Sequence, residues 1–405
     1  MTFEHLKLSI SLRKAIEKKG YKLPTPIQIE AIPVALEGKD IIACAQTGTG
    51  KSAAFCLPVL HQVEANKKQS GHIGIQALIL APTRELVTQI DESINTYGEF
   101  TGVNHTTLFG GIPRKVQIDY LSRDIDVLTA TPGRLLDMVE RGYADLSNVK
   151  YFVLDEADNM LNLGFIQEVQ KVIDLLPPAR HNMLFSATIP FEVRELCNSI
   201  LNNPVRIDIK TNIYEKGLID ESLYFVEKEL KKNLLFHLLE TQQIDSAFIF
   251  CRTRKGAEEL CDALKEKNYA AEAIHSDRTQ AERNRAIESF KNREIQLLVA
   301  TDVAARGIDV QKVSHVFNFE LPQETDSYTH RIGRTGRAGE IGKAISLCTP
   351  DDLQKIKDIE KSRKQKLKII EGHLYSNVKL LKKLMEKETE LEKKRKEQNR
   401  KRRNK

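Results

Sequence analysis

The segment Ala45–Ser52, with the sequence AQTGTGKS, is the stretch of the chain best suited to bind a polyphosphate. It lies between an apolar run at residues 40–43 and a helix-like segment that begins at residue 53, so a strand, a tight loop and a helix are expected. Backbone N–H groups of such a loop converge on one point, and the helix start adds the positive end of its dipole. The pattern predicts that Lys51 reaches the β- and γ-phosphates and that Ser52 binds Mg²⁺. An ordinary glycine-rich turn is the alternative, because the strict pattern has glycine where this chain has alanine at residue 45.

A group of carboxylates, Asp155–Asp158 (DEAD), follows directly after an apolar run at residues 151–154. Such a run is typical of a buried parallel strand, and ligands of open α/β sheets bind at the carboxyl ends of the strands. There Asp155 can hold the water shell of a metal, and Glu156 can orient or deprotonate an attacking water. The alternative, an acidic helix N-cap, accounts for one carboxylate but not for three in four residues.

The second half of the chain carries a dense arginine cluster, HRIGRTGR, at residues 330–337. Its three arginines are spaced three apart among glycines, and we expect that they cannot easily be buried in the core of their own domain. Two interpretations fit the spacing equally well. The cluster is a nucleic-acid patch on the surface, or it supplies arginine fingers to a phosphate held elsewhere.

Apolar runs alternate with helix-like segments in both halves, which predicts parallel sheets flanked by helices. In the first half, strands are expected at residues 40–43, 77–80, 126–130, 151–154 and 183–185. The alternation breaks around residues 202–220 and then resumes, with strands expected at residues 223–226, 247–250, 296–300, 314–319 and 344–347. The expected fold class is therefore α/β, with two units in tandem.

Before the first strand, Pro24 and Pro26 fix an extended path that delivers Gln28 to a set position. A glutamine amide can donate and accept at once, which suits the edge of an adenine. A proline-rich helix start is the alternative explanation.

The composition of the 405 residues is that of a globular protein with neither a membrane span nor a secretory signal, so a cytoplasmic location is expected. The six cysteines lie far apart without a C-x-x-C pair, which argues against disulfides and against a zinc site. The net charge of +6 is unevenly distributed, because residues 378–405 hold thirteen basic and five acidic residues and the other 377 residues together carry about −2. Such a tail is either a solvated disordered segment or a nonspecific tether for nucleic acid, which would be RNA if the resemblance described next holds.

The full motif series resembles the DEAD-box ATP-dependent RNA helicase family over residues 3–350. The matching segments, in family order, are Phe3 with Gly20-Tyr21, the Gln28 segment, AQTGTGKS, PTREL, Gly110-Gly111, TPGR, DEAD, SAT, FCRT, QAER, ATDVAARGID and HRIGRTGR. The resemblance implies two RecA-like domains that close on ATP and Mg²⁺, and a basic C-terminal tail. We expect a first domain at residues 1–208 with the glutamine motif at 3–28, a linker at 209–219, a second domain at 220–370 and a disordered tail at 371–405.

The resemblance also implies the roles of individual residues. The catalytic group would be Lys51, Asp155, Glu156, Arg334 and Arg337, the last two as fingers, with Mg²⁺ held by Ser52 and Asp155. The nucleotide would contact Phe3, Tyr21, Gln28, Gln46, Thr47, Gly48, Thr49, Gly50, Lys51, Ser52, Gly307 and Asp309. Coupling of hydrolysis to domain closure would fall to Asp158, Ser186, Thr188 and His330, and RNA would meet Arg84, Gly111, Thr131, Arg134, Arg252 and Thr301.

The implied function is an RNA-stimulated ATPase that unwinds short RNA duplexes locally and remodels RNA–protein complexes. An ATP-gated clamp that holds RNA is the second interpretation, and a DNA translocase is disfavoured by the DEAD and SAT forms. RNA would be bound through its backbone, independently of sequence, by a monomer that works with ribosomal or RNA-degradation complexes, as in ribosome biogenesis. The chain departs from the family pattern at Ser52, at Ser276 and at Asn159, and its short body with a lysine-rich tail is most similar to the bacterial RhlE-like branch.

Overall fold

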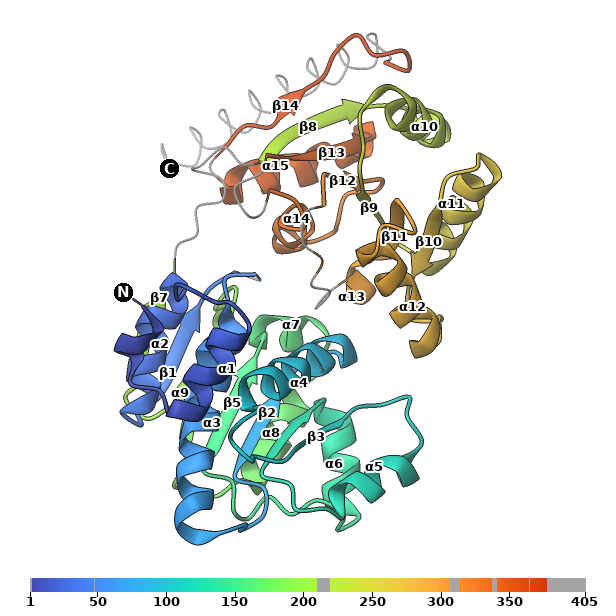
Figure 1. Cartoon of the computed structure of the whole chain (residues 1–405). Helices are drawn as coiled ribbons and strands as arrows, with labels where there is room; N and C mark the ends of the chain where they lie inside the picture. Colours follow the sequence, from blue (N-terminus) through green and yellow to red (C-terminus); the bar gives the residue numbers. More distant parts are fainter. Residues whose placement is uncertain are drawn as a thin grey trace, which may run out of the picture. The chain divides into compact units, whose positions relative to one another are not determined.

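The structure is a computed structural model that describes residues 2–46, 48–209, 219–305, 310, 313–336, 341–363 and 365–376. The chain divides into two compact units, Met1–Thr211 and Asn212–Lys405 (Figure 1). Most of the predicted linker and tail, residues 210–218 and 377–405, lies outside the described residues.

The first unit is built on a parallel sheet of seven strands in the order β3-β4-β2-β5-β6-β1-β7. Its strands are β1 (Ile41–Cys44), β2 (Ala77–Leu80), β3 (His105–Leu108), β4 (Val127–Ala130), β5 (Tyr151–Asp155), β6 (His181–Ser186) and β7 (Val205–Asp208). Its helices are η1 (Phe3–Leu6), α1 (Ile10–Lys18), α2 (Pro26–Leu36), α3 (Lys51–Ser70), α4 (Arg84–Gly98), α5 (Arg114–Leu121), α6 (Pro132–Glu140), α7 (Ala157–Asn162), α8 (Ile166–Leu175) and α9 (Phe191–Ile200).

Two apolar clusters cover the two faces of this sheet, because successive strand residues point to opposite sides. In β5, Val153 packs into a cluster with α1, α2, α3 and α4, whereas Phe152 and Leu154 pack into a second cluster with α6, α8 and α9. Burial on both faces explains why the central strands are continuous apolar runs. It also leaves the ends of the strands as the places where polar groups can gather.

The second unit repeats the architecture with a parallel sheet in the order β10-β11-β9-β12-β13-β8-β14. Its strands are β8 (Ile219–Phe225), β9 (Ala247–Cys251), β10 (Ala271–Ile274), β11 (Leu297–Thr301), β12 (His315–Asn318), β13 (Gly342–Cys348) and β14 (Lys368–Ile369). Its helices are η2 (Lys228–Leu230), α10 (Lys231–Thr241), α11 (Arg254–Glu266), α12 (Gln280–Lys291), α13 (Asp302–Ala305), α14 (Thr325–Ile332), η3 (Pro350–Asp352) and α15 (Leu353–Arg363). Helices α10 and α11 cover one face, and α12, α14 and α15 cover the other.

The predicted α/β class with two tandem parallel sheets is confirmed, and each sheet has two strands more than the five expected. The four additional strands are β3, β7, β10 and β14, which are the edge strands of the two sheets. Within the described ranges, no helix is long and apolar enough to cross a bilayer.

Candidate active site

The phosphate loop joins β1 to α3 at the carboxyl edge of the first sheet. Gly48 and Gly50 have φ of 83° and 92°, a conformation that side chains with a Cβ rarely adopt. The Thr49 hydroxyl donates to the Gln46 carbonyl at 2.7 Å, and α3 begins directly after the loop at Lys51. Thr47 lies outside the described residues. The expected strand, loop and helix are therefore present, and the loop has the backbone shape of a phosphate cradle.

Gln28 connects the glutamine motif to this loop. It lies in the first turn of α2, where its side-chain oxygen accepts from the Thr25 N–H at 3.0 Å and its amide nitrogen donates to the Gly50 carbonyl at 3.2 Å. A Cβ on Gly50 would lie 2.5 Å from that amide nitrogen, so glycine is required at this contact. The segment is thus a proline-rich helix start, as the alternative interpretation expected: the extended backbone ends at Thr25, and α2 begins at Pro26.

The two aromatic residues predicted to lie near the adenine differ in exposure. Phe3 is 8% exposed and belongs to the apolar cluster of the first unit. Tyr21 is 46% exposed, and its ring centroid lies 6.3 Å from that of Tyr97. Only Tyr21 presents a free ring surface in this structure.

Lys51 provides a test of whether an anion fits here. Its side chain is 6% exposed, and among the described residues its Nζ has no hydrogen-bond partner. Burying an ammonium group without a partner is costly, so the site is built for a ligand that carries negative charge. The nearby Asp155 is 2% exposed, and burial raises the pKa of its carboxyl, an effect that the positive charge of Lys51 opposes.

Glu156 follows Asp155 in a left-handed conformation, with φ of 53° and ψ of 51°, and caps α7. Its backbone N–H donates to Asp155 Oδ1 at 3.0 Å, and its carboxylate Oε2 accepts from Asn159 Nδ2 at 2.8 Å. The contact from Asn159 was not predicted from the sequence. Its position three residues after Glu156, at a helix start, was the one signal that could have indicated it.

Asp158 joins the DEAD segment to the SAT segment. Its Oδ2 accepts from the backbone N–H of Thr188 at 2.8 Å and from the Thr188 hydroxyl at 2.9 Å, and its backbone N–H donates to Ser186 Oγ at 3.0 Å. The structure thus brings together three of the four residues predicted to couple hydrolysis to closure. The fourth, His330, lies in the second unit.

Four residues predicted to bind RNA lie at the carboxyl ends of β2, β3 and β4. The Arg84 guanidinium lies against Gly111, where a Cβ would be 2.1 Å from Arg84 Nη1. Gly111 has φ of 88°, a conformation that favours glycine, and a side chain at this position would also displace the Arg84 guanidinium. Arg134 Nη1 donates to Gln117 Oε1 at 2.7 Å, and Thr131 is the N-cap residue of α6.

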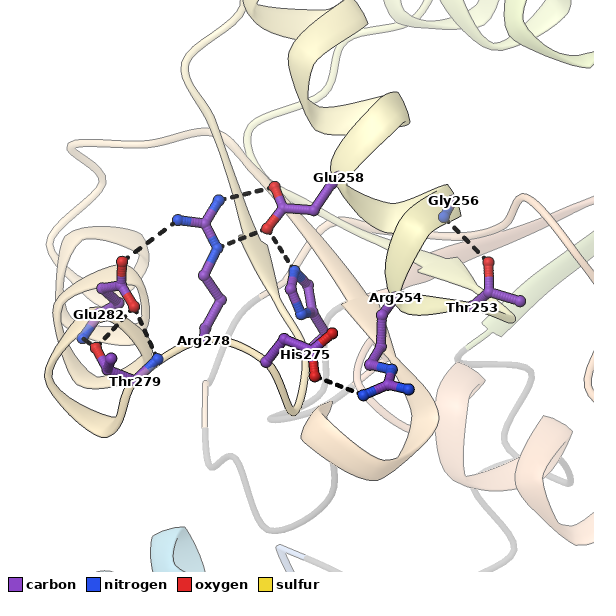
Figure 2. Close-up of polar contacts among 9 residues, drawn as sticks. Thr253, Arg254, Gly256, Glu258, His275, Arg278, Thr279 and Glu282 are labelled. Carbon is purple, nitrogen blue, oxygen red and sulfur yellow. Dashed lines mark hydrogen bonds and ion pairs between the residues drawn. The ribbon is translucent and has the colours of Figure 1, made fainter. Parts of the chain in front are cut away.

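In the second unit, a cluster of charged side chains fixes the loop that leads into α12 (Figure 2). Glu258 accepts from Arg278 through both carboxylate oxygens at 2.7 Å and contacts His275 Nε2 at 2.5 Å. Arg254 donates to Asp277 at 2.5 Å. These contacts place the loop beside the start of α11. Close to that start lies the exposed Arg252, one of the predicted RNA contacts, whereas Thr301 is 7% exposed.

The arginine cluster differs from the expectation that its arginines could not be buried in their own domain. Arg331 is 1% exposed and donates to both oxygens of Asp302 at 2.5 and 2.8 Å, and Arg334 is 5% exposed. The expectation was wrong because Asp302, together with Asn318 at 3.1 Å, supplies polar partners inside the unit. Arg337, Gly307 and Asp309 lie outside the described residues.

Comparison with known proteins agrees with this geometry. A profile of the DEAD/DEAH box helicases matches residues 25–196, and one of the helicase conserved C-terminal domain matches residues 230–339, which places the chain among the helicases. The DEAD-box ATP-dependent RNA helicases CshA of Bacillus cereus and Geobacillus kaustophilus are each 42% identical to it over 366 residues, covering 90% of this chain and 69% and 77% of those proteins. The chain belongs to the DEAD-box ATP-dependent RNA helicase family.

The solved structure of S. cerevisiae Dbp5 bound to RNA and ADP BeF3 is 33% identical and covers 91% of this chain and 95% of that chain, with a TM-score of 0.81. Likeness at this level supports the assignment of the two units as RecA-like domains. The narrower assignment to the RhlE-like branch stays a prediction, since these bacterial relatives carry the name CshA.

Proposed function

We propose that this chain hydrolyses ATP in a reaction that RNA stimulates, and that it uses the cycle to open short RNA duplexes locally and to remodel RNA–protein complexes. The observation that carries the proposal is the buried Lys51 ammonium, which has no partner among the described residues and lies beside Asp155 at the phosphate loop. A nucleotide phosphate supplies the missing hydrogen-bond acceptors.

The residues of the first unit divide the work of hydrolysis. Lys51 and the loop N–H groups bind the β- and γ-phosphates, and Glu156 orients and deprotonates the attacking water. Ser52 and Asp155 hold Mg²⁺, which neutralises charge on the phosphate oxygens when it is bound. Arg334 and Arg337 act as fingers from the second unit, and Gly307 and Asp309 contact the ribose.

Gln28 retains the capacity to recognise adenine. Two of the four hydrogen-bonding positions of its amide are used by Thr25 and Gly50. One N–H and one oxygen lone pair are left, which is the pair that an adenine edge requires. Phe3, Tyr21 and the remaining loop residues Gln46, Thr47, Gly48 and Thr49 complete the nucleotide contacts in this proposal.

RNA binding is supported by the similarity to Dbp5, whose solved structure contains RNA and ADP BeF3. In this chain Arg84, Gly111, Thr131, Arg134, Arg252 and Thr301 would contact phosphates and 2′-hydroxyls, so binding would not depend on sequence. Asp158, Ser186, Thr188 and His330 would couple hydrolysis to closure. We infer a cytoplasmic monomer that acts on ribosomal or RNA-degradation complexes.

The direct test is steady-state ATPase activity measured alone, with single-stranded RNA and with single-stranded DNA. The proposal predicts stimulation by RNA and little by DNA. The variant Glu156→Gln should keep ATP and RNA binding while turnover falls below detection, because an amide cannot accept the proton of the water. Persistent hydrolysis by this variant would reject Glu156 as the catalytic group.

Unwinding and clamping use the same residues and are separated by a short RNA duplex with one labelled strand. Strand release that requires ATP supports unwinding. Long-lived RNA retention with a nonhydrolysable nucleotide, together with little strand release, supports the clamp instead.

A further inference from the structure

The side chain of Asn159 contacts the carboxylate to which the catalytic role is assigned. It lies in the first turn of α7, is 6% exposed, and donates from Nδ2 to Glu156 Oε2 at 2.8 Å. Its position follows the DEAD segment and is outside the set of residues predicted to act on ATP.

The local backbone holds this amide in place. The N–H of Asn159 donates to the Glu156 carbonyl at 2.9 Å and to Asp158 Oδ1 at 3.0 Å. Glu156 itself has the left-handed φ of 53°, which turns its carboxylate back over the first turn of α7. Glu156 is the N-cap residue of α7 and Asn159 is its third helical residue, a pair whose side chain and cap lie within reach of each other at a helix start.

The hydrogen-bonding chemistry of the Asn159 amide determines which of its two ends faces Glu156. Only the N–H side can face a carboxylate, so Oδ1 is turned away, and among the residues described it is buried without a hydrogen-bond partner. A purely packing role would be served better by an apolar side chain of similar shape, since a buried unsatisfied oxygen is costly. The residue supplies a donor that Glu156 uses.

Asn159 also links the carboxylate to the pair predicted to couple hydrolysis to closure. Asp158 accepts from the Asn159 N–H through Oδ1 and from Thr188 through Oδ2. Hydrogen bonds therefore connect Thr188 to Glu156 through two consecutive residues, Asp158 and Asn159.

We propose that Asn159 is a positioning residue for ATP hydrolysis: its amide holds the Glu156 carboxylate in the orientation that the attacking water requires. The inference rests on the proposed function, because it assigns to Asn159 a role through Glu156. The orientation of a catalytic base affects the energy of the transition state, whereas Lys51 binds the phosphates in the ground state as well. Loss of the Asn159 amide should therefore lower kcat and leave the KM for ATP nearly unchanged.

The test uses the full chain with Asn159→Leu, which removes the donor at similar size, and Asn159→Asp, which places a second carboxylate against Glu156. Asn162→Leu, at the exposed end of the same helix, is the matched control. We expect RNA-saturated kcat to fall about 10- to 100-fold in Asn159→Leu and further in Asn159→Asp. The KM for ATP and the affinity for a nonhydrolysable analogue should stay close to those of the wild type and of Asn162→Leu, and circular dichroism at the assay temperature checks that each variant is folded.

Three outcomes would overturn the proposal: a kcat within twofold of wild type in both variants, a loss confined to KM, or a loss of analogue binding that parallels the loss of kcat. Asn159→Leu placed in the Glu156→Gln background gives a further check, since it should change neither RNA nor analogue affinity. If the wild-type chain shows no RNA-stimulated hydrolysis, the proposed function itself fails, and that failure is distinct from a normal rate in the Asn159 variants.

Discussion

Replacing Arg331 by methionine tests how much stability a buried arginine contributes to the second unit. The guanidinium is 1% exposed, donates to Asp302 at 2.5 and 2.8 Å, to Asn318 at 3.1 Å and to the Glu320 carbonyl at 2.6 Å, and lies 5.0 Å from the centroid of the Phe250 ring. Removing one partner of a buried pair costs about 3–5 kcal/mol. The Asp302 side chain is 29% exposed and can regain water, so we expect the lower end, about 3 kcal/mol.

The chain offers a matched control at the same distance. Arg254 also contacts an aspartate, Asp277, at 2.5 Å, but both side chains are 59% exposed. Exposed pairs contribute about 0–1 kcal/mol, so Arg254→Met should change the free energy of unfolding by less than about 1 kcal/mol. The comparison shows what a short Arg–Asp contact contributes when burial and the additional partners of Arg331 are absent.

Urea-induced unfolding followed by circular dichroism measures both changes, and hydrogen exchange of peptides from β9 and β11 assigns them to the second unit. Arg331→Lys should recover only part of the loss, because an ammonium cannot reproduce the two parallel bonds to Asp302. Equal shifts for Arg331→Met and Arg254→Met would refute the reasoning, as would a loss below about 1 kcal/mol for Arg331→Met.

Three further predictions concern other parts of the chain. Arg337→Ala should lower the RNA-stimulated ATPase rate by about 10³-fold while nucleotide affinity is retained, and a normal rate would exclude the finger role. Deleting residues 378–405 should weaken RNA binding and flatten its dependence on salt while the RNA-saturated ATPase rate is retained, and an unchanged salt slope would contradict a tether. Burial, reinforced by the positive charge of Lys343, lowers the pKa of His315 in the folded chain to about 4. As the pH falls from about 6.5 towards 4, the unfolded chain therefore binds a proton at His315 before the folded chain does, and the free energy of unfolding decreases. His315→Phe should therefore show a weaker loss of stability over that pH range in urea titrations, and an unchanged pH dependence would count against the assignment.

The strands that could be predicted are those that lie inside the two sheets. Central strands such as β2 (ALIL) and β9 (AFIFC) are buried on both faces and are therefore continuous apolar runs. The four that escaped prediction, including β3 (HTTL) and β10 (AEAI), are edge strands with a neighbour on one side only. Polar or small residues are tolerated at an edge, so the period and composition of these segments do not mark them as strands.

The candidate site was predictable where a motif specifies chemistry at fixed spacing, as for Lys51 and the DEAD segment. The contact of Asn159 depends on a local backbone conformation, and that of Arg331 on a tertiary partner; the motifs themselves specify neither. Asn159 faces Glu156 only because the backbone of Glu156 is left-handed, and Arg331 is buried only because Asp302 comes from another segment of the same unit. Sequence spacing indicates which side chains are available, and the folded chain decides which of them meet.

The close approach of Gln28 to Gly50 has a consequence for how the protein senses its fuel. A single side chain touches the loop that would hold the phosphates and still has a donor and an acceptor to offer to a purine. The Gln28 amide nitrogen donates to the Gly50 carbonyl at 3.2 Å, so a base that moved this amide would act directly on a hydrogen bond to the loop. Under the proposed function, base recognition and the shape of the phosphate loop would therefore be coupled within the first unit.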